Sequence, residues 1–170
     1  DARSLAAHAR SFTPLPHRLQ TLGTRDGITC VNDSIATTPQ AAQAALAHFA
    51  GSEVAILLGG HERGLDWAPF ARAVAAHPPR AIVTMGANGA RIADTLAAHG
   101  LAAIVQRATR LDEACAMARA ALGSRGVLLL SPGAPSFGQF RDYAERGRHF
   151  AELAGYDPCT ITDIHGLGIA

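Results

Sequence analysis

The sequence contains no lysine, because all 15 of its basic residues are arginine. This absence excludes a lysine Schiff base, a catalytic lysine and a Walker A phosphate-binding lysine from these 170 residues. The 14 acidic residues leave a formal net charge of +1, so no charge excess indicates binding to nucleic acid or to an anionic membrane. No apolar run approaches the roughly 18 residues that a membrane-spanning helix needs.

Cysteine and aromatic residues are also scarce. Cys30, Cys115 and Cys159 are odd in number and far apart, so we expect buried thiols rather than a disulfide framework, as in a cytoplasmic protein. The eight histidines show no H-x-x-x-H spacing, and we assign no metal to ligands from this chain alone. The chain begins at Asp1 without methionine or a signal peptide, which fits either processing or a fragment of a longer protein.

The hydrophobic pattern alternates between strand-sized and helix-sized segments, in a chain that is 48% hydrophobic and long enough for about one domain. A short helix at 4–10 precedes a hairpin, in which Gly27 supplies a positive φ at the turn. Strands are expected at 18–22, 28–31, 53–58, 81–85, 101–105 and 127–130, and helices at 39–49, 67–76, 88–99, 111–122 and 139–154. This order predicts a three-layer α/β domain, with a mostly parallel sheet, an antiparallel hairpin at one edge and helices on both faces.

Ligands of such sheets bind where the loops leave the carboxyl ends of the strands. In the loop 32–39, Asp33 and several hydroxyls precede a helix start at Thr38, which suits a ribose or an anion but also a plain turn. In the loop 59–66, Arg63 offers a bidentate fork for a carboxylate, or it pairs locally with Glu62 or Asp66. Both interpretations remain open for each loop.

Two further loops carry weaker signals. The loop 86–90 holds only a fragment of a dinucleotide fingerprint and is more typical of an ordinary strand-to-helix corner. In the loop 131–138, Ser136 stands three residues before Gln139, so we expect it to cap the last helix and to help form an anion-binding pocket there. Trp67, Phe70 and Phe150 are expected in the core, and Arg141, Arg146 and Arg148 on a solvated helix face.

Taken together, the segments 15–19, 31–38, 58–66 and 130–137, followed by Arg146 and Gly147, resemble the C-terminal domain of Mur ligases over residues 13–155. The resemblance implies a Rossmann-like domain that delivers the amino acid to an ATP-dependent amide ligase of peptidoglycan synthesis. Residues 1–12 would link it to a missing central domain, and residues 156–170 would form a tail. ATP would convert the substrate carboxylate into an acyl phosphate, which the amine of the amino acid attacks, with Mg²⁺ held mainly by the central domain.

The resemblance also assigns roles to single residues. The nucleotide would be bound by His17, Arg18 and Asp33, and glutamate by Thr37, Arg63, Ser136, Phe137 and Tyr143. No catalytic residue is expected in this domain alone, and we expect a cytoplasmic, monomeric enzyme whose other partners are its own N-terminal and central domains. The isolated fragment is expected to be inactive.

The substrates implied are UDP-N-acetylmuramoyl-L-alanine and glutamate. Ile35 stands where D-glutamate-adding members carry a lysine, and Arg63 replaces a second lysine. A bias toward arginine explains the second change but not the first, which removes a charge. With these two changes and with residues 164–168, the sequence resembles the branch of Mur ligases that adds L-glutamate. The alternatives are a D-glutamate-adding member, a related Mur-type or folate-type ligase for another amino acid, and a stand-alone binding module.

Overall fold

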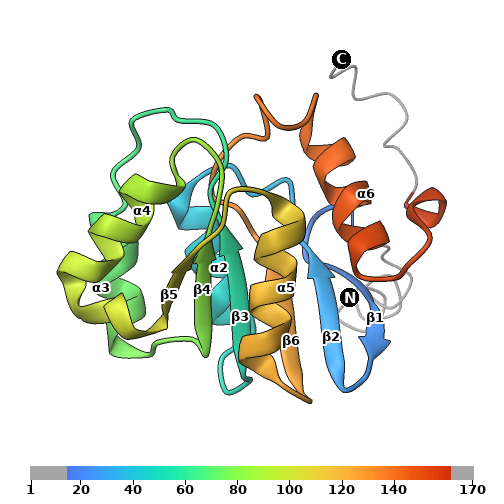
Figure 1. Ribbon diagram of the computed structural model, residues 1–170, viewed down its shortest axis with the longest axis horizontal. Helices are drawn as coiled ribbons and strands as arrows, with labels where there is room; N and C mark the ends of the chain where they lie inside the picture. Colours follow the sequence, from blue (N-terminus) through green and yellow to red (C-terminus); the bar gives the residue numbers. More distant parts are fainter. Residues whose placement is uncertain (1–14, 162–170) are drawn as a thin grey trace, which may run out of the picture.

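Six strands form one sheet in the order β1-β2-β6-β3-β4-β5 (Figure 1), in a computed structural model that describes residues 15–161. The strands are β1 (Gln20–Arg25), β2 (Ile28–Asn32), β3 (Val54–Leu58), β4 (Ala81–Thr84), β5 (Val105–Arg107) and β6 (Gly126–Leu130). β1 pairs with β2 in antiparallel fashion, and all other neighbours are parallel. The predicted sheet with its antiparallel edge hairpin is confirmed.

Helices cover both faces of the sheet. They are α2 (Pro39–His48), α3 (Ala68–Ala76), α4 (Gly89–Leu96), α5 (Leu111–Leu122) and α6 (Tyr143–Leu153), with a 3-10 turn η3 (Pro158–Thr160) after α6. In β3, Ala55 and Leu57 face the side covered by α5 and α6, whereas Ile56 and Leu58 face α2, α3 and α4. This alternation of buried side chains produces two cores, one on each face. Trp67, Phe70 and Phe150 are buried in them, as predicted.

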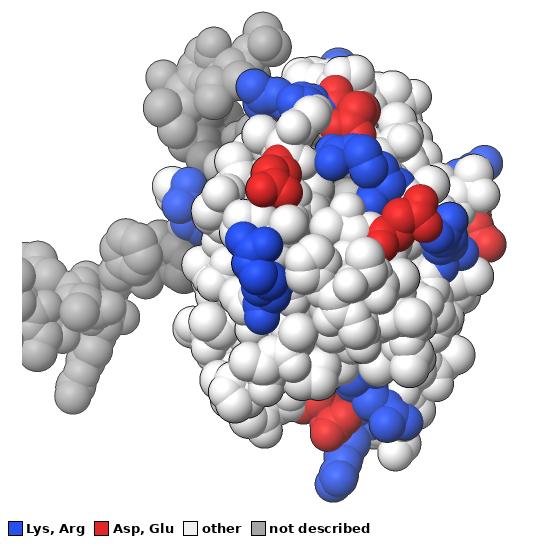
Figure 2. Space-filling model, turned by 90° about the vertical axis from the view of Figure 1, so that its left-hand side faces the viewer, with Lys and Arg blue, Asp and Glu red and all other residues white. Residues whose placement is uncertain are grey.

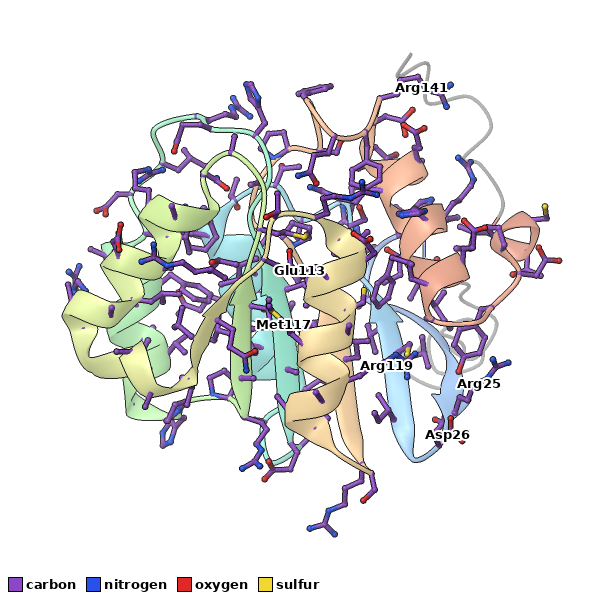
Figure 3. All side chains as sticks on the ribbon, viewed as in Figure 1. Arg25, Asp26, Glu113, Met117, Arg119 and Arg141 are labelled. Carbon is purple, nitrogen blue, oxygen red and sulfur yellow. The ribbon has the colours of Figure 1, made fainter. Side chains whose placement is uncertain are left out.

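Helix α5 lies against the middle of the sheet, and Figure 3 shows Glu113, Met117 and Arg119 on it. The Nη2 of Arg119 donates to Sγ of Cys30 on β2 at 3.5 Å and to the carbonyl of Ala154, at the end of α6, at 3.4 Å. Cys30 and Cys115 are buried, as expected, and burial raises the pKa of the Cys115 thiol to about 12. Cys159 is exposed, so the prediction of a buried thiol is wrong there, because it lies in the surface turn η3.

The edge hairpin turns at Asp26 and Gly27, and Figure 3 shows Asp26 near Arg25 at the end of β1. Asp26 has φ +52° and Gly27 has φ +77°, so both central residues of this two-residue turn are left-handed. The prediction of a positive φ at Gly27 is confirmed.

The structure departs most from the predicted elements at residues 101–105 and at the start of the last helix. The strand expected at 101–105 is replaced by the segment η1 (Ala97–Leu101), whose backbone leaves the helical conformation at His99 and Gly100, and by a 3-10 turn η2 (Ala102–Ile104), so that β5 begins only at Val105. A short apolar run fits a helical turn as well as a strand, and here Leu101 packs into the α3–α4 core. The predicted helix 4–10 lies outside the described residues.

The last helix begins at Tyr143 rather than at residue 139, so Ser136 does not cap it. Asp142 is the N-cap, and its Oδ1 accepts a hydrogen bond from Glu145 N at 2.7 Å. Asp142 and Glu145 have the same capping-box spacing as Ser136 and Gln139, and the later pair forms the helix start. Gln139 instead donates from Nε2 to the carbonyl of Thr109.

Within residues 15–161, no helix is long and apolar enough to cross a membrane. The same part of the chain holds no group of three or more histidine, cysteine, aspartate or glutamate side chains arranged to hold a metal ion.

Candidate functional site

The loops predicted to carry the chemistry meet at one edge of the sheet, the upper edge in Figure 1. Leu130 of β6 pairs with Asn32 of β2 on one side and with Leu57 of β3 on the other, so these three strands end within one residue of one another. The chain leaves β2 for α2 on one face and leaves β6 for α6 on the opposite face. Such a reversal opens a crevice at the carboxyl edge, where ligands of α/β sheets bind.

Asp33 is hydrogen-bonded to the loop after β6 and to the turn before β1. Its Oδ2 accepts a hydrogen bond from Ser131 Oγ at 2.6 Å, and its Oδ1 accepts one from Leu19 N at 3.1 Å. The side chain is 5% exposed, and this desolvation raises the pKa of Asp33 above its ordinary value. Because a carboxylate offers about four acceptor sites, Asp33 retains acceptor capacity for a ligand beyond these two bonds.

Arg18 projects from a strained turn beside Asp33. Its neighbours His17 and Leu19 have φ values of +62° and +43°, which are unfavourable for side chains other than glycine. Three hydrogen bonds fix the turn. Leu19 N donates to Asp33, and His17 N donates to Gln20 Oε1 at 3.0 Å. Ile35 N donates to the carbonyl of His17 at 3.2 Å. The structure therefore presents an exposed guanidinium on a rigid backbone, next to a buried carboxylate.

His17 lies beneath that turn and is 2% exposed. Asn32 donates from Nδ2 to His17 Nδ1 at 3.0 Å, so the imidazole proton resides on Nε2, which is buried without a hydrogen-bond partner among residues 15–161. Burial is the main cause that lowers the pKa of His17 to about 4, so the ring is neutral at pH 7. The rings of His17 and Tyr143 pack in a T-shaped arrangement, with 5.7 Å between ring centroids.

Arg146 is the main residue that sequence reasoning placed wrongly. It is 1% exposed rather than on a solvated face, and burial lowers the pKa of its guanidinium to about 9. Its Nε donates to Ser34 Oγ at 2.9 Å, Nη2 to the carbonyl of Ser34 at 2.8 Å, and Nη1 to the carbonyl of Ala134 at 3.0 Å. Arg146 thus joins α6 to the loops after β2 and β6. Arg141 is exposed, as predicted, and Arg148 is half-buried.

The burial of Arg146 could have been predicted from the helical periodicity of residues 143–153. Arg146 and Gly147 share the buried face of α6 with Phe150 and Ala151, at the spacing of successive helical turns. The charge of Arg146 alone suggested solvent, whereas its position on the apolar stripe indicated burial.

A cavity of about 220 Å³ lies between the loops after β3, β4 and β6. Its walls include Gly60, Gly86, Ser136, Phe137 and Arg146. Gly60 is required by close packing, because a Cβ there would stand 2.2 Å from the carbonyl oxygen of Pro135. Ser136 is buried at the wall, whereas Phe137 is 57% exposed and packs edge-on against His61.

The structure groups the predicted residues in two places. His17, Arg18 and Asp33 lie together on the β2 side, and Tyr143 joins them through His17. Ser136 and Phe137 line the cavity, whereas Thr37 is half-buried and Arg63 is exposed on the loops after β2 and β3, which flank β6. Glu62 pairs with Arg91 rather than with Arg63, so the alternative of a local Arg63–Glu62 ion pair is wrong.

Comparison with known proteins identifies relatives. Residues 17–133 match the family "Mur ligase, glutamate ligase domain". The UDP-N-acetylmuramoyl-L-alanine--L-glutamate ligase of Xanthomonas euvesicatoria pv. vesicatoria (strain 85-10) is 58% identical over 172 residues, which cover 99% of this chain and 37% of that enzyme. The enzyme with the same name from Xylella fastidiosa (strain Temecula1) is 56% identical over 173 residues, or 100% of this chain and 37% of that enzyme. The chain therefore spans little more than a third of these relatives.

Solved structures show the same fold at low identity. UDP-N-acetylmuramate-alanine ligase from Thermotoga maritima matches with a TM-score of 0.60 and 19% identity, over 85% of this chain and 31% of that one. Mycobacterium tuberculosis folylpolyglutamate synthase complexed with ADP matches with a TM-score of 0.57 and 18% identity, over 79% of this chain and 33% of that one.

Proposed function

Since this chain belongs to the Mur ligase, glutamate ligase domain family, we propose that it is the C-terminal domain of an ATP-dependent ligase that adds L-glutamate to UDP-N-acetylmuramoyl-L-alanine. The observation that carries the proposal is the 58% identity to L-glutamate ligases over 99% of the chain. Because the chain spans 37% of such an enzyme, the activity belongs to the longer protein.

The β2 side of the crevice suits a nucleotide. The exposed guanidinium of Arg18 can pair with a phosphate, and the free acceptor sites of Asp33 can bind ribose hydroxyls. The neutral ring of His17 adds no charge there, so we assign it the role of supporting the Arg18 turn. In the whole enzyme, ATP supplies the phosphoryl group that activates the substrate carboxylate, and this domain positions the nucleotide and the amine that attacks.

The β3 and β6 side suits an amino acid with two carboxylates. Arg63 supplies a planar fork that can hold one carboxylate in a fixed orientation, and buried Ser136 supplies a hydroxyl at the cavity wall. Holding the amino acid at two points orients its amine, which is how a binding domain accelerates attack on an activated acyl group.

Magnesium does not fit this domain alone. No cluster of three potential ligands occurs in the part of the chain that the structure describes, and the glycine-rich cavity offers no carboxylate among its lining residues. We therefore assign no step to a metal bound by these residues.

Ile35 is the residue on which we base enantiomer selection. It is half-buried in the loop after β2, and its side chain carries no charge, whereas the cation Arg63 lies on the loop after β3. With the cation supplied from the β3 loop, the carboxylate and the amine of the bound amino acid adopt the arrangement suited to L-glutamate. We expect Thr37 and Tyr143 to complete the pocket when the domains close.

The assay that tests the function uses the full-length enzyme with ATP, Mg²⁺ and UDP-N-acetylmuramoyl-L-alanine, and offers L-glutamate and D-glutamate separately. We expect ligated product with L-glutamate and none with D-glutamate. The 170-residue domain alone is expected to turn over no ATP, because it lacks the phosphoryl-transfer residues. Product from D-glutamate alone would refute the proposed specificity for L-glutamate. ATP turnover by the isolated domain would refute the proposal that the phosphoryl-transfer residues lie in the rest of the enzyme.

Steady-state kinetics of two variants test the two sides of the crevice. Arg63→Ala is expected to raise the KM for glutamate roughly 10- to 100-fold, the effect of losing a charged hydrogen-bond pair, and to leave the KM for ATP nearly unchanged. Asp33→Asn retains an acceptor for Leu19 N and should show the reverse split, with the KM for ATP raised. Equal changes in both constants for either variant would remove that residue from its assigned substrate.

A further inference from the structure

The corner after β4 is bonded to the start of the loop that carries Arg63. Asn88 is 3% exposed, and its Oδ1 accepts a hydrogen bond from Gly60 N at 2.8 Å. Its Nδ2 donates to the carbonyl of His61 at 3.4 Å, and its backbone N donates to the carbonyl of Gly60 at 3.2 Å. Asn88 therefore fixes the two residues that precede Glu62.

Arg91, on the first turn of α4, holds the loop on both sides of Arg63. Its Nε and Nη2 donate to Oε2 and Oε1 of Glu62, each at 2.7 Å, and Nη1 donates to the carbonyl of Leu65 at 3.1 Å. Glu62 Oε1 also accepts a hydrogen bond from Gly64 N at 2.5 Å. One guanidinium thus determines the spacing of Glu62 and Leu65, between which Arg63 lies.

Side chains, rather than backbone pairing, determine the shape of this loop. Among the described residues, 62–66 make no backbone–backbone hydrogen bond, whereas His61 N is bonded to the carbonyl of Pro135. Trp67, 1% exposed, anchors the far end. Without the Arg91 contacts, the segment between His61 and Trp67 would keep, within the part of the chain that the structure describes, only the local hydrogen bonds from Gly64 N to Glu62 and from Ala68 N to Asp66.

The same ion pair keeps the charge of Arg63 available. Both oxygens of Glu62 are engaged by Arg91, which lowers the pKa of that carboxyl to about 2, so Glu62 stays ionised and paired at neutral pH. Asp66 accepts a hydrogen bond from Ala68 N at 2.9 Å. Arg63 itself makes no ion pair with any residue in the range 15–161.

Figure 2 shows the side of the molecule that carries α3 and α4, where basic and acidic side chains lie next to one another. The pairs Arg91–Glu62 and Arg107–Asp94 both involve α4. Both ion pairs are exposed and contribute little to stability. The main effect of the Arg91–Glu62 pair is therefore on the shape of the loop that it holds.

We propose that Arg91, together with Asn88, is a positioning residue for Arg63, and holds the loop 59–66 in the shape that presents the Arg63 guanidinium to a carboxylate of the incoming amino acid. The proposal rests on the proposed function. It gives a role to the β4 corner, whose glycines resembled a fragment of a nucleotide-binding motif.

The test measures the full-length enzyme with Arg91→Met, Arg91→Lys and the control Arg107→Met, which removes the other exposed pair on α4. We expect Arg91→Met to raise the KM for glutamate about 5- to 20-fold, with kcat and the KM for ATP changed less than about twofold. Arg91→Lys should show most of this increase, because it retains the charge but not the three-way fork. Arg107→Met should change neither constant, and no Tm should shift by more than about 2 °C.

A double variant decides whether Arg91 acts through Arg63. Arg63→Ala with Arg91→Met should bind glutamate no worse than Arg63→Ala alone, since the loop then has no cation to position. Additive losses, full activity of Arg91→Met, restoration of the glutamate KM by Arg91→Lys, or an equal rise in the KM for ATP would each overturn the proposal.

Trypsin gives a readout that does not depend on the reaction. These 170 residues contain no lysine, so trypsin cuts this domain only after arginine, and cleavage after Arg63 reports the mobility of this loop. We expect Arg91→Met to accelerate that cut several-fold relative to Arg107→Met. An accelerated cut in an enzyme that fails to ligate glutamate would refute the proposed function but not the fixing of the loop by Arg91. An unchanged cut, with ligation intact, would refute the positioning proposal alone.

Discussion

Replacing Arg146 by methionine is expected to lower the free energy of unfolding of this domain by about 4 kcal/mol, since each buried acceptor left without a donor costs about 1–3 kcal/mol. Methionine fills a similar volume but leaves the carbonyls of Ser34 and Ala134 without their donors. Relief from burying a cation offsets part of this loss. Chemical denaturation followed by circular dichroism measures the difference.

Arg141→Met is the matched control. Arg141 lies two residues before the start of α6, and Figure 3 shows it at the periphery of the molecule, so its replacement should change stability by less than about 0.5 kcal/mol. Arg146→Lys should have an intermediate free energy of unfolding, because one ammonium group cannot reach all three acceptors of the guanidinium. If Arg146→Met were as stable as Arg141→Met, the buried bonds from α6 to the two loops would not hold the site together.

The second large effect is expected at Gly147, on the same face of α6. A Cβ at this position would stand 2.2 Å from Nδ1 of His17 and 2.8 Å from Nδ2 of Asn32. Gly147→Ala must therefore separate α6 from that pair, at a cost of about 2–4 kcal/mol from overpacking and a lost hydrogen bond, beyond the gain in helix propensity. A domain of this size should show a fall in Tm of roughly 5–12 °C by calorimetry.

Gly89→Ala supplies the comparison, because Gly89 is also helical and a Cβ there would meet its nearest neighbour, the backbone of Thr84, at an ordinary 3.4 Å. This variant should be neutral or slightly stabilising. In the full-length enzyme, Gly147→Ala should also weaken ATP binding, since His17 lies directly under the Arg18 turn. Equal stability of the two alanine variants would contradict the close packing of α6 on His17.

The arrangement of the sheet could be predicted from the sequence because buried strands and amphipathic helices differ in period and length. Residues 54–58 and 127–130 are short apolar runs bounded by turn residues, and both form central strands. Residues 101–105 show where this reasoning fails, because an apolar run beside Gly100 also fits a helical turn, and packing on α3 and α4 decides between the two.

The site was harder to predict, because its contacts join residues far apart in the chain. Periodicity places Arg63 on a loop, but only the fold brings Arg91 to Glu62 and leaves Arg63 unpaired among residues 15–161. Asp33 was identified from its position after a strand, whereas its bonds to Leu19 and Ser131 depend on which strand lies next to β2. The capping role was wrongly assigned to Ser136 because two successive pairs, Ser136 with Gln139 and Asp142 with Glu145, share the capping-box spacing, and sequence alone does not rank them.

The insertion of β6 between β2 and β3 has a consequence for how the domain folds. Ile28 of β2 pairs with Gly126 of β6, and most of the domain lies between them in the chain. Pairing of these two central strands therefore closes a very long loop. The β1–β2 hairpin can form locally and early, but Asp33 meets Ser131 only when this last strand is in place. Because pairing between residues far apart in the chain is slow, we expect this closure to be a late, cooperative step. We therefore expect a nascent or partly unfolded chain to lack the β2 side of the crevice, where we propose that the nucleotide binds, so that nucleotide binding would report complete folding of the domain.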